Sequence, residues 1–263
     1  MTVSLHLAGR GGRAAFLAAA SMLAMTAGAY ADDSKGFFDD FSTLNRGRWY
    51  ISDGWSNGTW QNCGWSAKEI SVASGILNVG FSHNPEAKRD YRCGEIQSYT
   101  KLSYGTYEAR IKTPSGSGLN AAFFTYIGSP HDEIDMEFLL KDLDHVSTTT
   151  FVNGKSGDGT KGNGEMTPLP QPSDSGFVDY AMVWTPEKLD FYANHKLIRS
   201  IDTPSQIPTQ PQKIYLSLWG SDTLTDWMGA FSDPGQPIAM QVDWIGYTPQ
   251  GAHCLFPQSI TCS

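Results

Sequence analysis

The chain has 263 residues, of which 40% are hydrophobic and 12% aromatic, with a formal net charge of -8 and a pI near 5.1. This length and apolar content suffice for one domain with a sizeable core. The acidic balance excludes nucleic acid and anionic membranes as partners, because no basic stripe is present to hold their phosphates. We therefore expect a single domain, with a monomer as the default state.

The first 31 residues are typical of an export signal. Two arginines precede an apolar stretch over 14–29, which ends in a small-residue cleavage site at Ala29-Tyr30-Ala31. A membrane anchor is the alternative, but the apolar run is shorter than the roughly 20 residues that a spanning helix needs. We predict a signal peptide over 1–31 and a secreted or periplasmic mature chain over 32–263.

Four cysteines lie in the exported part: Cys63, Cys93, Cys254 and Cys262. An even number of cysteines in a secreted chain indicates disulfides, here two. Three pairings are possible in principle, but Cys254 and Cys262 close a short loop in the tail, which leaves Cys63 with Cys93. A zinc site is the alternative, and no Cys-x-x-Cys pair or neighbouring histidine pair supports it.

Short runs of alternating apolar and polar residues fill the chain from Phe37 to Tyr247, separated by Gly, Asn, Asp and Pro. Such alternation is typical of β-strands. The expected strands cover 75–81, 104–113, 178–185, 189–201, 213–220 and 240–247. Ala193-Asn194-His195 is a plausible hairpin turn. Because no stretch sustains a helical period, we expect an all-β fold, a two-sheet β-sandwich or jelly roll.

Two segments lack this pattern. The stretch 152–176 is rich in Gly, Pro and polar residues. It is either a linker between domains or a surface loop, and we expect a loop, because the same strand pattern resumes after it. The tail from about 248 carries the last two cysteines, and we expect an irregular extension.

The stretch "HDEIDMEFLL" over 131–140 places Glu133, Asp135 and Glu137 at alternate positions, with apolar residues between them. In a strand, the three acids share one face and their neighbours enter the core, whereas a helix scatters the acids. Crowded carboxylates raise at least one pKa. The alternatives are a solvated acidic edge or a calcium site, although calcium normally draws ligands from a loop.

A pair of carboxylates is the machinery of glycosidic bond cleavage. Along a strand, Cα atoms of Glu133 and Glu137 are about 13 Å apart. On a concave sheet, the two side chains can lean to the roughly 5–5.5 Å separation of a retaining mechanism. Asp135 lies between them and can share a proton with either neighbour. A Ser-His-Asp triad is not supported, because the chain has no nucleophile elbow.

"DEIDMEF" resembles the E-I-D-x-E signature of glycoside hydrolase family 16, the β-glucanases of jelly-roll fold. The similarity extends from about Phe37 to Tyr247 through "GWSNGTWQNCGW", "FFTYIG" and "LWGSDTLTDWMG", and looks closest to bacterial lichenases and succinoglycan depolymerases. The resemblance implies a concanavalin-like sandwich with a concave groove and no cofactor for catalysis. It also implies that Glu133 is the nucleophile, Glu137 the general acid/base and Asp135 the assisting carboxylate.

Tryptophans interleave with Asn, Asp and Gln over 55–65 and 218–227. Aromatic rings stack on the apolar faces of sugars, so these clusters favour a groove, although core packing is the alternative for any one ring. By resemblance, the glucan-contacting positions are Trp55, Asn57, Glu95, Tyr126 and Trp227, with Trp219 a weaker candidate, and Cys63 and Cys93 match the family disulfide. His131, at the end of the acid row, is expected in a subsite or a pKa-tuning role rather than as a catalytic base.

Three positions depart from the lichenase pattern: Gln97 stands in place of Arg, His131 in place of Trp and Gly220 in place of Asn. These departures concern which glucan is recognised and not the chemistry. Family members often hold a structural calcium, for which Asp243 and the backbone of Asp40 and Gly75 are the matching positions.

We therefore expect a secreted endo-acting, retaining β-glucan hydrolase that cleaves 1,3-1,4-β-glucan or a bacterial exopolysaccharide such as succinoglycan. The signature lacks the extra residue of laminarinases, which disfavours a strict 1,3-glucanase. Plant xyloglucan transglycosylases, which also carry a histidine before the signature, and chitin-glucan transglycosylases share the short form, so a transglycosylase is the second hypothesis. A lectin-like binding module is the third, and the crowded acids argue against it.

Overall fold

The structure, a computed structural model, describes residues 34–84, 89–157, 159 and 161–262. The predicted signal peptide lies outside the described residues. Within these ranges no helix is both long and apolar enough to cross a membrane. The helices described are α1 (Thr225–Met228) and the 3-10 turns η1 (Ala67–Glu69), η2 (Pro204–Gln206) and η3 (Ile260–Cys262).

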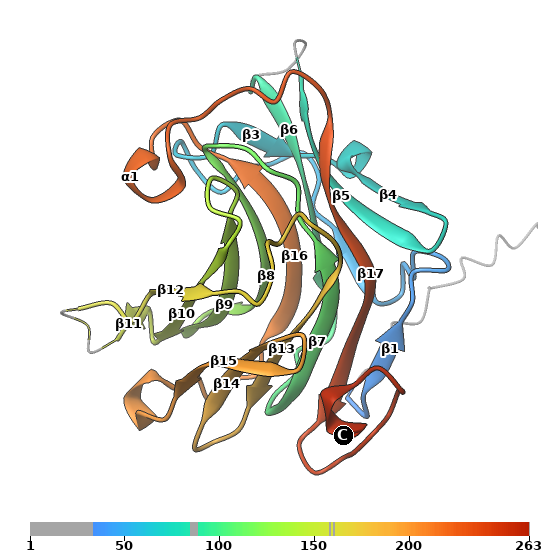
Figure 1. Cartoon of the computed structure of the whole chain (residues 1–263), viewed down its shortest axis with the longest axis vertical. Coiled ribbons are helices and arrows are strands. Elements are labelled where there is room, and N and C mark those ends of the chain that lie inside the picture. The colour runs from blue at the N-terminus through green and yellow to red at the C-terminus, as the bar shows by residue number, and fades with distance from the viewer. Residues whose placement is uncertain (1–33, 85–88, 158, 160, 263) are drawn as a thin grey trace, which may run out of the picture.

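Strands form two curved sheets that share β6 (Figure 1). The strands of the first sheet are, in spatial order, β15 (Lys196–Ile201), β14 (Leu189–Ala193), β13 (Val178–Trp184), β7 (Gly105–Lys112), β17 (Ile238–Pro249), β5 (Ile76–His83) and β4 (Ile70–Ala73). Two short strands join this sheet: β1 (Phe37–Asp39) pairs with β17, and β3 (Cys63–Trp65) runs parallel to the start of β6. The second contains β2 (Trp49–Ile51), β6 (Tyr91–Ser98), β16 (Lys213–Gly220), β8 (Leu119–Gly128), β9 (His131–Leu139) and β10 (His145–Val152), with β11 (Lys155–Ser156) and β12 (Glu165–Pro168) on β10. The predicted all-β sandwich is confirmed.

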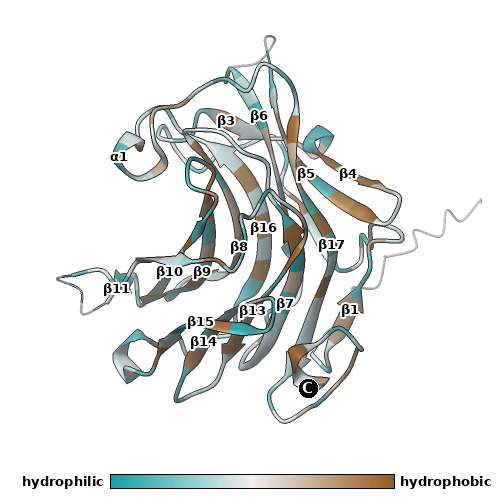
Figure 2. Ribbon diagram, in the orientation of Figure 1, coloured by the Kyte–Doolittle hydropathy of each residue, from teal (hydrophilic) through white to brown (hydrophobic). Residues whose placement is uncertain are grey.

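The core lies between the two sheets and is built from the apolar half of each alternating strand. Hydrophobic residues alternate with more polar ones along β16 (Figure 2). From β9, Ile134, Met136 and Phe138 are buried, and the Phe138 ring packs edge-on against Tyr180 of β13 in the opposite sheet, with centroids 4.8 Å apart. Each such side chain contributes about 1.5–3 kcal/mol by leaving water. This burial fixes which face of β9 is turned outward.

The predicted hairpin turn between β14 and β15 is confirmed. Ala193 pairs with Lys196, and the two residues between them, Asn194 and His195, have φ values of 47° and 61°. Positive φ at both central residues is the geometry of a two-residue type I′ turn. Asn194 suits this position because asparagine tolerates the left-handed region better than most residues.

The prediction of a loop over 152–176 is wrong in part. Strands β11 and β12 lie within this segment and both pair with β10, so that Thr148 is opposite Glu165. Strands of two and four residues carry too little alternation to be recognised from sequence. The segment therefore extends the second sheet beyond β10.

Both predicted disulfides are present. Cys63 is bonded to Cys93, which joins β3 to β6, and Cys254 is bonded to Cys262 in the tail. The predicted pairing is confirmed.

Candidate active site

The acid row lies on β9, between β8 and β10. Glu133 is opposite Tyr126 of β8, Asp135 opposite Phe124 and Glu137 opposite Ala122. Because side chains alternate along a strand, these carboxylates share the face opposite to the buried apolar residues. The predicted common face for the three acids is thus confirmed, and that face is turned away from the core.

A groove crosses the acid row. On one side of the row is a cavity of about 620 Å³, and on the other side a cavity of about 500 Å³, and both are lined by all three acids. Strands β8, β9 and β16 are curved, with α1 and β11 projecting on the same side (Figure 1). A polymer can therefore lie across the carboxylates, with part of its chain on either side.

The structure places six of the predicted sugar-contacting residues along this groove, whereas His131 lines neither cavity and contacts Glu133 instead. The larger cavity is lined by Trp55, Asn57, Glu95, Tyr126 and Trp219, and the smaller one by Trp227 of α1. The rings of Trp219 and Trp227 lie 6.1 Å apart and so connect the two halves. Aromatic faces on both sides of the acids suit a chain of sugar rings.

Glu137 is partly buried, beside the neutral amide of Asn120 and within the influence of the Glu133 charge. Its Oε1 accepts a hydrogen bond from the Asn120 side chain at 2.8 Å. Burial raises the pKa of Glu137 to about 7, although the Asn120 hydrogen bond acts in the opposite direction. A carboxyl group with this pKa holds a proton near neutral pH, which is the property of a general acid.

Glu133 has a different set of partners. His131 Nε2 lies 2.8 Å from Glu133 Oε2, and the side chains of Glu133 and Asp135 are hydrogen-bonded to each other. Burial raises the pKa of Glu133, whereas the bonds to His131 and Asp135 lower it. Those bonds favour the ionised form, as a nucleophile requires.

Asp135 is fully enclosed between the two glutamates. Burial first, and then the charges of Glu133 and Glu137, raise the pKa of Asp135 well above its ordinary value. These influences favour the protonated form of Asp135, which is the form that can donate a hydrogen bond to Glu133. The pKa values of the three carboxyl groups are thus shifted by different neighbours, although burial is the first cause for each.

Glu95 lies across the groove from the acid row, on β6. It is opposite Ser217 of β16, and its carboxyl group accepts a hydrogen bond from the Ser52 hydroxyl at 2.5 Å. Burial raises the pKa of Glu95 to about 7. This position suits contact with sugar hydroxyls rather than with the reacting bond.

Several groove residues were not predicted from sequence. They are Ala122, Phe124, Tyr215 and Ser217 in the larger cavity, and Ser147, Thr149, Phe151, Gly164, Glu165 and Met166 in the smaller one, whereas Trp60 and Trp65 belong to the predicted cluster over 55–65. Alternation could have identified Tyr215 and Ser217, since they share a strand face with Trp219. The residues of β12 carry no such signal, because a strand of four residues shows too little alternation.

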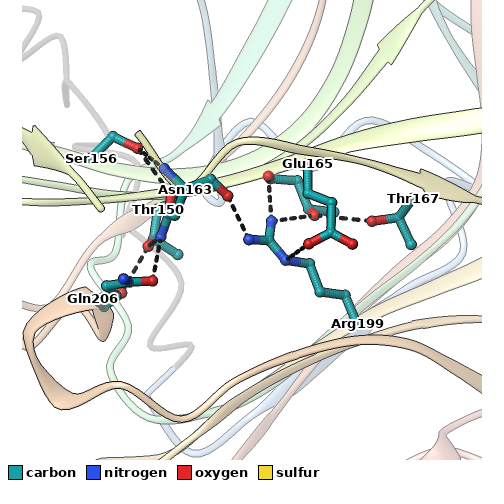
Figure 3. Close-up of polar contacts among 8 residues, drawn as sticks. Thr150, Ser156, Asn163, Glu165, Thr167, Arg199 and Gln206 are labelled. Atoms are coloured by element: carbon teal, nitrogen blue, oxygen red, sulfur yellow. Dashed lines mark hydrogen bonds and ion pairs between the residues drawn. The ribbon is translucent and has the colours of Figure 1, made fainter. Parts of the chain in front are cut away.

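The wall of the smaller cavity is held by a half-buried arginine, Arg199 (Figure 3). From β15, Arg199 donates to the carbonyl and hydroxyl oxygens of Thr148 and to the carbonyl of Asn163, and it pairs with Glu165 at 3.2 Å. The Asn163 amide in turn donates to Thr150 at 2.7 Å. The arginine thereby connects an edge of the first sheet to the groove wall.

Of the three predicted calcium positions, Asp40 and Gly75 are neighbours, whereas the Asp243 carboxylate is already paired with an arginine. A side chain at Gly75 would lie 3.8 Å from the carbonyl oxygen of Asp40, so these two positions are neighbours. The Asp243 carboxylate, however, lies 3.1 Å from Arg110 Nε. The guanidinium group competes with a cation for this carboxylate.

A β-sandwich with paired carboxylates inside an aromatic groove is typical of a jelly-roll glycoside hydrolase. The model of the glycosyl hydrolases family 16 matches residues 57–246. The chain belongs to this family and is a glycoside hydrolase.

Comparisons of sequence and of structure both give relatives that are beta-glycanases or beta-glucanases by name. The chain is 46% identical over 232 residues to the endo-1,3-1,4-beta-glycanase ExoK of Rhizobium meliloti, covering 87% of this chain and 84% of that protein. It is 34% identical to the beta-glucanase of Bacillus subtilis, covering 87% of this chain and 92% of that protein. The structure of the Bacillus licheniformis beta-glucanase superposes with a TM-score of 0.75 at 31% identity, covering 82% and 98%.

Proposed function

We propose that the protein is an endo-acting, retaining hydrolase of 1,3-1,4-β-glucan or of a related bacterial exopolysaccharide such as succinoglycan. The observation that carries this proposal is the row of three carboxyl groups crossing an aromatic groove. The names of the relatives, an endo-1,3-1,4-beta-glycanase and beta-glucanases, support the same substrate class. A groove that extends to both sides of the acids favours cleavage within a chain.

The reaction proceeds in two displacements. Glu137 donates its proton to the glycosidic oxygen while the Glu133 carboxylate attacks the anomeric carbon, and the bond to the leaving sugar breaks. The ionised Glu137 then takes a proton from water, whose oxygen attacks the same carbon and releases Glu133. The net result is one hydrolysed bond with the anomeric configuration retained.

Asp135 acts by hydrogen bonding rather than by bonding to the sugar. Its proton, donated to Glu133, stabilises the carboxylate that must be ionised before attack. Its own burial keeps it neutral, so the site does not hold three negative charges at once.

The substrate is tested by measuring reducing-end release, with product sizing, on barley β-glucan, laminarin, xyloglucan and succinoglycan. We expect short oligosaccharides from barley β-glucan or from succinoglycan. Products longer than the substrate would instead indicate a transglycosylase. No release of reducing ends from any of the four polymers would contradict the proposal and favour a binding module.

The assignment of the nucleophile is tested with Glu133→Gln. Because the amide cannot form the glycosyl-enzyme, we expect kcat to fall at least about a thousandfold, with oligosaccharide binding and the melting temperature maintained. Glu187→Gln, at an exposed turn before β14, is the matched control. Activity of Glu133→Gln within about tenfold of the parent would rule out this nucleophile.

We also propose that the protein acts outside the cytoplasm as a monomer. The two disulfides support an oxidising compartment, because such bonds persist outside the reducing cytosol. N-terminal sequencing of the exported protein should give Asp32 as the first residue.

A further inference from the structure

Two lysines face each other beside the larger cavity. Leu102 and Gln212 form an antiparallel bridge, with N–H to O distances of 2.7 and 2.8 Å. Lys101 precedes Leu102 and Lys213 follows Gln212, so the bridge places these two residues on opposite chains at adjacent positions. Like charges in this arrangement destabilise a sheet.

Lys213 begins β16 and shares a strand face with Tyr215 and Ser217, which line the larger cavity. It is opposite Tyr126 of β8, which is itself opposite Glu133 of β9. Two strand spacings put the Cα atoms of Lys213 and Glu133 about 10 Å apart. Lys213 Nζ donates to Gln97 Oε1 at 3.0 Å, and both Gln97 and Tyr126 line the cavity.

Within the described residues, no carboxylate pairs with the ammonium groups of Lys101 and Lys213. Partial burial and the charge of Lys101 both lower the pKa of Lys213, and no carboxylate contributes in the opposite direction. An ammonium group has three donors, and the bond to Gln97 uses one of them.

This arrangement is unusual for a chain with a net charge of -8. A half-buried lysine opposite a second lysine costs stability, and a bound anion offsets that cost. A neutral glucan offers only hydroxyl groups, whereas a carboxylate forms charge-assisted hydrogen bonds with both ammonium groups.

We propose that Lys101 and Lys213 form an anion-binding subsite at the end of the groove, which takes a carboxylate substituent of an acidic polysaccharide. The proposal rests on the proposed function, because the subsite has a role only if a polysaccharide lies in the groove. It assigns to the lysines a preference for acidic over neutral polymer, while Glu133 and Glu137 perform the chemistry on either polymer.

The test compares native succinoglycan with the same polymer after chemical reduction of its carboxyl groups. For Lys213→Gln and Lys101→Gln we measure KM and kcat on both polymers. We expect KM for the native polymer to rise about five- to tenfold more than KM for the reduced polymer, as for a partly buried ion pair. Lys196→Gln, which removes the same charge in the exposed β14–β15 hairpin, should leave both values unchanged.

The outcomes separate the subsite from the proposed function. Equal effects of Lys213→Gln on the native and reduced polymers, or no effect on either, would overturn the subsite while the parent protein still cleaves both. If the parent cleaves neither these polymers nor barley β-glucan, the proposed function fails. Salt provides a second readout: added NaCl should weaken the preference of the parent for native polymer, and should have little effect in Lys213→Gln.

Discussion

Glu133 and Glu137 are the same residue type on the same strand face, yet their partners differ. His131 and Asp135 contact Glu133, whereas Asn120 contacts Glu137. The hydrogen bonds to His131 and Asp135 lower the pKa of Glu133 and so favour its ionised form. Burial raises the pKa of Glu137 to about 7, and the hydrogen bond from Asn120 offsets this only in part. The division of roles therefore follows from the hydrogen bonds to each side chain.

The pH dependence of kcat/KM should reflect this difference. Activity requires Glu137 to be protonated, so it should fall as pH rises through about 7. It also requires Glu133 to be ionised, so it should fall again at acidic pH. His131→Ala removes a bond that lowers the pKa of Glu133, so the acidic limb should move to higher pH.

The matched control is His253→Ala, in the exposed tail, which should leave both limbs in place. The profile is measured as initial rates from about pH 4 to pH 9 with the same polymer. An acidic limb that stays in place in His131→Ala would show that His131 does not stabilise ionised Glu133.

Strands β12 and β15 belong to different sheets, and Arg199 connects them. Its guanidinium group reaches Thr148, Asn163 and Glu165, so the wall of the smaller cavity is tied to the edge of the first sheet (Figure 3). Only a planar group with several donors in a fixed fork makes all of these contacts. Arg199 is thus a positioning residue for Glu165 and Met166, which line the groove.

Arg199→Leu should leave the carbonyl oxygens of Thr148 and Asn163 without their donor. We expect the free energy of unfolding to fall by about 1–3 kcal/mol and KM to rise severalfold. The kcat pH profile should stay the same, because Glu133 and Glu137 keep their partners. Arg46→Leu, at an exposed position, is the control for loss of one arginine. Equal KM values for the Arg199→Leu and Arg46→Leu variants would contradict the positioning role.

Alternation in the sequence identified the long strands and the common face of Glu133, Asp135 and Glu137, because a period of two is visible over seven or more residues. It did not identify β12, which is held in place by its pairing with β10 and by the ion pair of Glu165 with Arg199 rather than by its own pattern. Nor did it show that Lys101 lies beside Lys213, since the bridge at Leu102 joins positions far apart in the chain. Local pattern predicts which face a residue occupies, whereas tertiary pairing decides its neighbours.

The molecule as a whole combines a rigid sandwich with a groove on one outer face. The disulfide between Cys63 and Cys93 joins β3 to β6, the strand that both sheets share. The groove walls at Trp55 and Trp65 are adjacent to this crosslink, and their rings lie 6.1 Å apart. Stability of the sandwich and shape of the groove are therefore connected.

A structural calcium would add to that stability, and it stays a prediction. If the ion binds at Asp243 with the backbone of Asp40 and Gly75, then calcium at 100 times its Kd contributes about 2.7 kcal/mol. A chelator should lower the melting temperature by about 5–10 °C, and added calcium should restore it. Asp243→Asn should abolish the response to chelator. An unchanged melting temperature in the parent would show that Arg110 alone occupies this carboxylate.

The most direct test of the account is the configuration of the first product, followed by proton NMR during cleavage of barley β-glucan or succinoglycan. Attack by Glu133, followed by water activated by Glu137, predicts that the β-anomer of the new reducing end appears first and then mutarotates. Initial appearance of the α-anomer would mean a single displacement by water and would contradict the assignment of Glu133 as the nucleophile.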